Sequence, residues 1–68
     1  MSCFGERLKE LRKEKGLSQK ALAQALGYNQ SMICFLENRV NEPTESAIRK
    51  AALFFEVSAD YLLGLSDD

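Results

Sequence analysis

The chain has 68 residues, of which 46% are hydrophobic and 28% charged, and its formal net charge is −1. This size and composition predict one small globular domain, near the lower limit at which an apolar core holds without disulfides or a metal. No apolar run approaches the roughly 18 residues that a membrane span needs, and no signal peptide is visible. The sequence therefore predicts a reduced, cytoplasmic protein without a membrane partner.

The residue types that carry most catalytic and metal chemistry are scarce. Cys3 and Cys34 are far apart and form no CxxC pair, and the chain contains no histidine. This argues against a zinc site and against histidine acid–base chemistry, and both thiols are interpreted as small apolar residues. With no nucleophile–base pair and no phosphate-cradling glycine loop, we expect no catalytic residue, no metal, no cofactor and no enzyme activity.

The charge is divided along the chain. Seven basic and three acidic residues lie between Arg7 and Arg39, a balance of +4, whereas two basic and six acidic residues follow from Val40 onward, a balance of −4. Such a division can present a basic face to phosphate while the other half stays acidic. A solvated first helix with i,i+4 ion pairs explains the same pattern without a nucleic acid, and both interpretations stay open.

Two short helical patterns separated by a glycine stand at the centre of the chain, in residues 18–38. Ser18 is placed to cap a helix that ends near Leu26, and Gly27 suits the left-handed conformation that closes a helix. Asn29 is placed to cap a second helix over residues 30–38. Two helices joined by a short glycine-containing turn predict a helix-turn-helix, in which the second helix enters the DNA major groove.

The flanking segments also show helical spacing. A first helix is expected over residues 4–15, ended by Gly16, and a loop over residues 39–43, because the residue before Pro43 is pushed out of helical geometry. Thr44 and Ser58 read as caps of a fourth helix over residues 45–56 and of a short fifth helix, and residues 65–68 as a frayed tail. No period-2 run indicates a strand. The prediction is an all-α, compact five-helix bundle with a single domain over residues 1–68.

The inward stripes of these helices define the expected core. Because each helix is too short to be stable alone, the fold must depend on their packing. The predicted core residues are Leu8, Leu11, Leu22, Ala23, Leu26, Ile33, Leu36, Ile48, Ala52, Phe55, Val57 and Leu62, with Met32 at the edge.

Three segments together carry a family resemblance. RLKELRKEKGLSQKALAQALG, then ICFLEN, then EPTESAIRKAALFFEVSADYLLG resemble the lambda-repressor/Cro-type (XRE-like) helix-turn-helix family from about Phe4 to Gly64. The resemblance implies a lambda-repressor-like DNA-binding domain of a prokaryotic or phage transcriptional regulator, usually a homodimer on a two-fold site in double-stranded DNA.

The resemblance also implies roles for individual residues. Gln19 is similar to a glutamine that hydrogen-bonds a DNA phosphate, while Gln30 and Ser31 stand where the family's recognition helix enters the groove. Cys34 and Phe35 occupy base-reading positions that are often polar, so here the chain departs from the family. Phe35 can contact a thymine methyl, or it can pack against a neighbour or a partner protein.

Further phosphate contacts are implied around the two helices. Besides Gln19, the implied phosphate-contacting residues are Lys20, Asn29, Asn38, Arg39 and Asn41. Arg39 stands where the family often has glycine, and few lysines follow, so we expect modest affinity per monomer and binding that depends on a dimer.

Arg12 and Glu37 match positions that form a semi-buried ion pair in many family members. Each residue also lies next to an expected core leucine, Leu11 and Leu36, which suggests the same pairing without the family. The pair would tie the first helix to the third.

Several apolar residues exceed the needs of the core. They lie in residues 44–65, and the expected dimer contacts among them are Leu53, Phe54, Tyr61 and Leu65. Scattered exposure or an enlarged core is the alternative explanation without a dimer.

The function expected from these patterns is a sequence-specific transcriptional repressor that reads the major groove with residues 30–38. A protein-interaction module such as an antitoxin or antirepressor is the alternative, favoured by Cys34 and Phe35 on the reading face and by the acidic overall charge. With no room for a second domain, no small-molecule effector is expected. Whether these residues form part of a longer regulator stays open.

Overall fold

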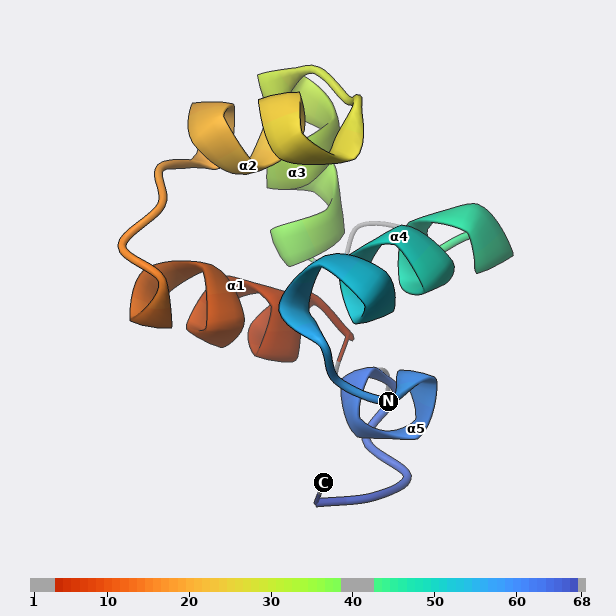
Figure 1. The fold of residues 1–68 in the computed structure, drawn as a ribbon. Coiled ribbons are helices and arrows are strands. Elements are labelled where there is room, and N and C mark those ends of the chain that lie inside the picture. The colour runs from red at the N-terminus through yellow and green to blue at the C-terminus, as the bar shows by residue number, and fades with distance from the viewer. Residues whose placement is uncertain (1–3, 39–42, 68) are drawn as a thin grey trace.

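The computed structural model describes residues 4–38 and 43–67, which form five helices and no strand. The helices are α1 (Phe4–Glu14), α2 (Gln19–Leu26), α3 (Gln30–Glu37), α4 (Glu45–Phe55) and α5 (Ala59–Leu62). Their order and bounds agree with the expected ones to within a residue or two, and the all-α prediction is confirmed (Figure 1). The expected loop over residues 39–43 lies outside the described residues except for Pro43.

Local capping explains why four helices begin where they do. The side chain of Ser18 accepts a hydrogen bond from the Ala21 amide at 3.0 Å, and the side chain of Asn29 accepts one from the Met32 amide at 2.8 Å. Thr44 and Ser58 cap α4 and α5 in the same way. Each cap satisfies an amide that has no partner within its helix, so these starts are encoded within three or four residues.

The turn between α2 and α3 depends on a left-handed residue. Gly27 has φ 79°, and the Tyr28 amide donates to the Ala23 carbonyl at 2.8 Å, which closes the end of α2. Glycine adopts this conformation without the cost that a Cβ imposes. α4 ends with the same backbone conformation at Glu56, φ 58°, where a side chain is present.

One apolar core joins all five helices. Its buried members are Phe4, Leu8, Leu22, Ala23, Leu26, Ile33, Leu36, Ala47, Ala51, Phe55 and Leu62. Most of the expected core is therefore confirmed, and Met32 lies at its edge as predicted. Ile48 and Ala52 are only partly buried, because the rotation of α4 about its axis directs Ala47 and Ala51 inward instead. Leu11 and Val57 are also only partly buried, and Phe4 is a core residue that the prediction omitted.

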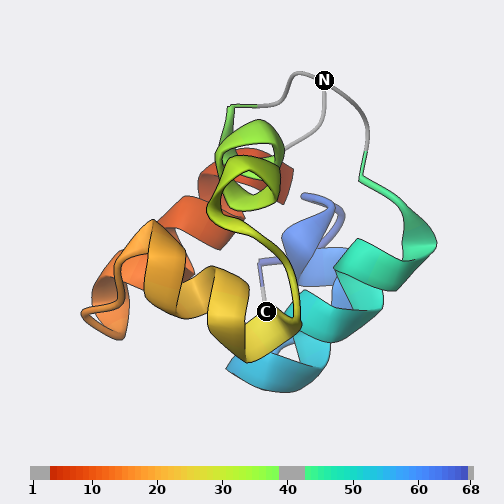
Figure 2. The same cartoon turned by 90° about the horizontal axis from the view of Figure 1, so that it is seen from above.

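The helices pack around α1 and α2 in a way that leaves one side of α3 uncovered. α3 packs against α1 and α2, α4 against α2 and α5, and α5 also against α1. Figure 1 shows α2 and α3 at one end of the molecule and α5 at the other, with α4 between them, and Figure 2 gives the same arrangement seen from above. None of the described helices is both long and apolar enough to cross a membrane.

Candidate nucleic-acid interface

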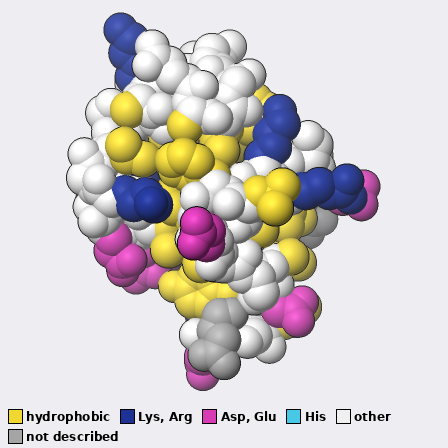
Figure 3. Space-filling model, in the orientation of Figure 1, with side chains coloured by type: hydrophobic (Ala, Val, Ile, Leu, Met, Phe, Trp, Pro, Cys, Tyr) yellow, Lys and Arg dark blue, Asp and Glu magenta, His cyan; other side chains and the backbone are white. Residues whose placement is uncertain are grey.

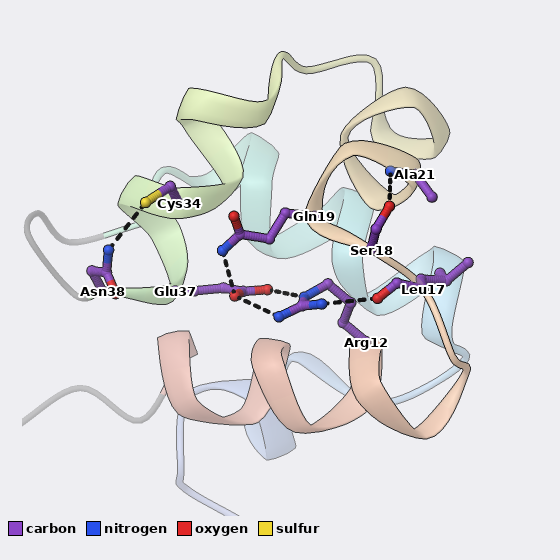
Figure 4. Close-up of polar contacts among 8 residues, drawn as sticks. All are labelled: Arg12, Leu17, Ser18, Gln19, Ala21, Cys34, Glu37 and Asn38. Carbon is purple, nitrogen blue, oxygen red and sulfur yellow. Dashed lines mark hydrogen bonds and ion pairs between the residues drawn. The ribbon is translucent and has the colours of Figure 1, made fainter.

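A buried ion pair fixes α3 relative to α1. Arg12 Nε donates to Glu37 Oε2 at 2.6 Å, and Arg12 Nη2 donates to Glu37 Oε1 at 3.2 Å (Figure 4). The exposed fractions of the two side chains are 11% and 1%. Because the pair is shielded from water, its two parallel hydrogen bonds fix both the distance and the relative orientation of the guanidinium and the carboxylate. The end of α3 is therefore held in place on α1.

The same network extends to the start of α2. Arg12 Nη1 donates to the Leu17 carbonyl at 2.8 Å, and Gln19 Nε2 donates to Glu37 Oε1 at 3.1 Å. Throughout the described segments, every buried side-chain nitrogen or oxygen has a hydrogen-bond partner. The Glu37 carboxylate therefore connects α1, the first residue of α2 and the end of α3, which are the parts that set the helix-turn-helix geometry.

Gln19 has an intramolecular role that sequence reasoning missed. Its amide was expected to reach a DNA phosphate, and in the structure it donates one hydrogen to Glu37. A primary amide has two N–H groups, so the second remains available at the N-terminus of α2. The contact joins residues 18 positions apart, and no local signal in the sequence indicates it.

The outward side of α3 gathers the residues expected to read bases. Gln30, Ser31, Cys34 and Phe35 are all exposed, and Asn38 follows on the same side at the end of the helix. The exposed fraction of Phe35 is 48%, a high value for an aromatic side chain in so small a domain. Asn38 Nδ2 donates to Cys34 Sγ at 3.2 Å, a contact visible in Figure 4 on the side of α3 away from Arg12.

The expected phosphate contacts fall into three groups. Gln19, Lys20 and Asn29 stand at the N-termini of α2 and α3, where the positive ends of the helix dipoles favour an anion. Asn38 stands at the opposite end of α3. Arg39 and Asn41 lie outside the described residues.

Two basic residues from the positively charged half of the sequence contact aromatic rings of the acidic half. The guanidinium of Arg7 lies 4.2 Å from the ring centroid of Tyr61, and the ammonium of Lys15 lies 5.6 Å from that of Phe54. These two cations, which belong to the basic half, thus lie against aromatic rings of the acidic half. A third, Arg12, is paired with Glu37. In the view of Figure 3, which has the orientation of Figure 1, Lys and Arg side chains lie beside hydrophobic side chains. These ring contacts leave both positive charges in place, and Lys15 remains exposed.

The exposed apolar surface of the C-terminal helices is also narrower than expected. Leu53 and Leu65 are each 75% exposed, whereas Phe54 and Tyr61 are partly buried beneath Lys15 and Arg7. An open groove of about 530 Å³ passes beside Leu53. Its lining residues come from α4 and α5 and the residue after α5: Glu45, Ile48, Arg49, Ala52, Leu53, Ala59 and Leu63.

Comparison with known proteins identifies the fold and the family. The helix-turn-helix family model matches residues 8–62. The transcriptional regulator ImmR of Bacillus subtilis is 35% identical over 61 residues, which are 90% of this chain and 48% of ImmR. The chain spans about half the length of the curated relatives ImmR and YobD, 48% and 58% respectively.

Solved structures agree with this assignment. The P22 c2 repressor in complex with a synthetic operator has a TM-score of 0.85 and 27% identity, over 97% of this chain and 100% of that one. The Bacillus subtilis biofilm regulator SinR in complex with DNA has a TM-score of 0.79 and 33% identity, over 88% of this chain and 97% of that one. The chain, with its capped helix-turn-helix and five-helix core, belongs to the lambda-repressor/Cro-type (XRE-like) family of helix-turn-helix transcriptional regulators.

Proposed function

We propose that this chain is the DNA-binding part of a transcriptional repressor and that it inserts α3 into the major groove of double-stranded DNA. The observation that carries the proposal is the contrast within α3. Its inward side is fixed by the core and by the Arg12–Glu37 pair, while its outward side presents hydrogen-bonding groups to solvent. A rigid helix with a free polar face is what base reading requires, since register must be set before individual bases are distinguished.

Phosphate contacts at the N-terminus of α2 would set that register. The second N–H of the Gln19 amide, the backbone amides at the first two positions of α2 and the exposed Lys20 stand at the end of the helix that a phosphate would approach. Glu37 restrains the Gln19 amide before DNA arrives, so less conformational freedom is lost on binding. Such contacts supply affinity without distinguishing sequences.

Two-fold pairing of the chain would supply the rest of the affinity. The groove beside Leu53 and the exposed Leu65 offer an apolar surface on α4 and beyond α5. A homodimer through this surface would present two copies of α3, which must lie about 34 Å apart to enter successive major grooves. A regulator of this kind works in the cytoplasm, at the chromosome.

Selection of DNA from a random duplex pool tests the proposal. We expect a motif with two-fold symmetry and an affinity that falls steeply as salt rises, because each neutralised phosphate releases counterions. A pool that yields no enriched motif, together with weak binding that is insensitive to sequence, would overturn the proposal.

A second candidate function is a protein-interaction module that uses the same helix-turn-helix. It is favoured by the large exposed fraction of Phe35, 48%, on the very side of α3 that should meet DNA. In that case a partner protein covers Phe35, and Phe35→Ala weakens the partner complex while Lys20→Ala leaves it unchanged. On DNA the same Lys20→Ala change reduces the salt dependence by about one phosphate contact.

A further inference from the structure

The outward side of α3 carries no charged side chain. Between Gln30 and Asn38 the one charged residue is Glu37, which is 6% exposed, points inward and is paired with Arg12. The outward residues are two amides, a hydroxyl, a thiol and a phenyl ring. The side chains of α3 therefore cannot make the bidentate arginine or lysine contact to guanine, which is the commonest specific contact in the major groove.

Two kinds of base contact remain for these residues. The amides and the hydroxyl can hydrogen-bond base edges, and a glutamine such as Gln30 suits adenine N6 and N7. The ring offers an apolar surface, and so does the thiol, whose sulfur already accepts a hydrogen bond from Asn38. In the major groove the one apolar group that a base presents is a methyl at C5 of a pyrimidine.

One depression on α3 has a suitable lining for such a methyl. Ser31, Cys34, Phe35 and Asn38 line an open depression of about 290 Å³ on the outward side of α3. Cys34 and Phe35 give it apolar walls, while Ser31 and Asn38 stand at its polar edges. Asn38 Nδ2 donates to Cys34 Sγ, which holds the edge of the depression in position (Figure 4).

We propose that this depression binds the C5-methyl group of a pyrimidine, so that the protein distinguishes 5-methylpyrimidines from their unmethylated counterparts at one position of each half-site. The inference rests on the proposed function, because it requires α3 in the major groove. Ser31 is compatible with both natural sources of the group. Its hydroxyl can donate to O4 of thymine and can accept from the N4 amine of 5-methylcytosine.

Substitution of deoxyuridine for each thymidine of the selected operator tests this directly. The exchange removes the methyl and leaves the hydrogen-bonding groups unchanged, and it alters only the DNA, so protein folding is not at issue. We expect a loss of about fourfold in affinity at one thymidine of each half-site, the effect of leaving one methyl unburied. All other thymidines should respond less than twofold.

A variant protein links that loss to the depression. In Phe35→Ala the sensitive thymidine should no longer respond to deoxyuridine, whereas in Gln24→Ala, which shortens an exposed side chain on α2, the response should remain. Far-UV circular dichroism at the assay temperature establishes that both variants are folded. A full deoxyuridine response in folded Phe35→Ala would overturn the assignment to this depression.

Thymine and 5-methylcytosine, the two possible sources of the methyl group, can be distinguished at the same position of the operator. With a C·G pair placed there, methylation of the cytosine at C5 should improve binding about fourfold if any C5-methyl is accepted. Equal affinity for both forms restricts the site to thymine. If the protein binds its operator specifically but no thymidine responds to deoxyuridine, this inference fails and the proposed function stands. If no duplex is bound specifically, both fail.

Discussion

The two sides of α3 reverse the usual placement of residue types. The inward side carries the charged residue, Glu37, which is 6% exposed, and the outward side carries the aromatic residue, Phe35, which is 48% exposed. A buried carboxylate is costly unless it is paired, and an exposed ring gives up the free energy of its burial. The comparison shows that this eight-residue helix has one side that positions it and another that is left for a partner. Stability and binding should therefore be separable by mutation.

Glu37→Ala should have the largest effect and act on the inward side. It leaves the guanidinium of Arg12 buried without its carboxylate and removes the acceptor of Gln19, so we expect a loss of about 3–5 kcal/mol in the free energy of unfolding. A chain of this length has a total stability on the order of 3–10 kcal/mol, so the variant approaches complete unfolding. Equilibrium urea denaturation measures the change.

Glu45→Ala is the matched control for the buried pair. Glu45 also pairs with an arginine, Arg49, at 3.0 Å, but the two side chains are 86% and 68% exposed. Exposed pairs contribute about 0–1 kcal/mol, so this variant should unfold close to the wild-type urea concentration. Similar losses in Glu37→Ala and Glu45→Ala would show that burial of the Arg12–Glu37 pair is energetically unimportant.

Leu53→Ala tests whether the chain binds DNA as a monomer or as a dimer that presents two copies of α3. If Leu53 is buried at a two-fold contact, its truncation should weaken dimerisation by about tenfold or more, from the roughly 1.5–3 kcal/mol that burial of a leucine contributes. Stability of the monomer should hardly change, because the side chain is 75% exposed. Sedimentation equilibrium, with and without the selected operator, gives the dissociation constants. A wild-type chain that stays monomeric on operator DNA at high micromolar concentration would contradict the dimer.

Gln30→Ala should affect binding and spare stability. We expect a loss of about 1–3 kcal/mol in operator affinity, confined to one base-pair position, because the amide would no longer distinguish that base. Gln24→Ala is the control, since Gln24 is also an exposed glutamine and lies on α2. Fluorescence anisotropy with operators changed one position at a time gives both affinity and position. A uniform loss at all positions would assign Gln30 to the backbone instead.

Glu56→Gly should have the smallest effect, and of opposite sign. Glu56 has φ 58° at the end of α4, a conformation that costs a residue with a side chain about 1–2 kcal/mol. Glycine removes this cost and loses part of the gain through its larger unfolded-state entropy, so a net stabilisation below about 1 kcal/mol is expected. Thermal unfolding should show a small rise in Tm, and a fall would mean that the Glu56 side chain has an unrecognised stabilising contact.

The helices were predictable because their signals are local. Ser18, Asn29, Thr44 and Ser58 each act within three residues, and Gly27 acts through its own φ angle. The choice of Ala47 and Ala51 over Ile48 and Ala52 as buried residues was not predictable, because it depends on how α4 rotates against its neighbours.

The sequence predicted which residues belong to the site, but not most of the contacts between them. Arg12 and Glu37, 25 residues apart, were paired mainly through the family resemblance. The Gln19–Glu37 hydrogen bond and the position of Arg7 over Tyr61 depend on tertiary packing, which sequence spacing does not encode.

One measurement tests the central claim that the outward side of α3 contacts DNA. Amide chemical shifts of the labelled protein are followed while the selected duplex is added to saturation. The account predicts the largest changes at the N-terminus of α2 and at the outward residues of α3, above all Gln30, Ser31 and Phe35, whatever changes dimerisation causes on α4. Saturation of the protein with DNA while the amides from Gln30 to Asn38 keep their shifts would contradict it.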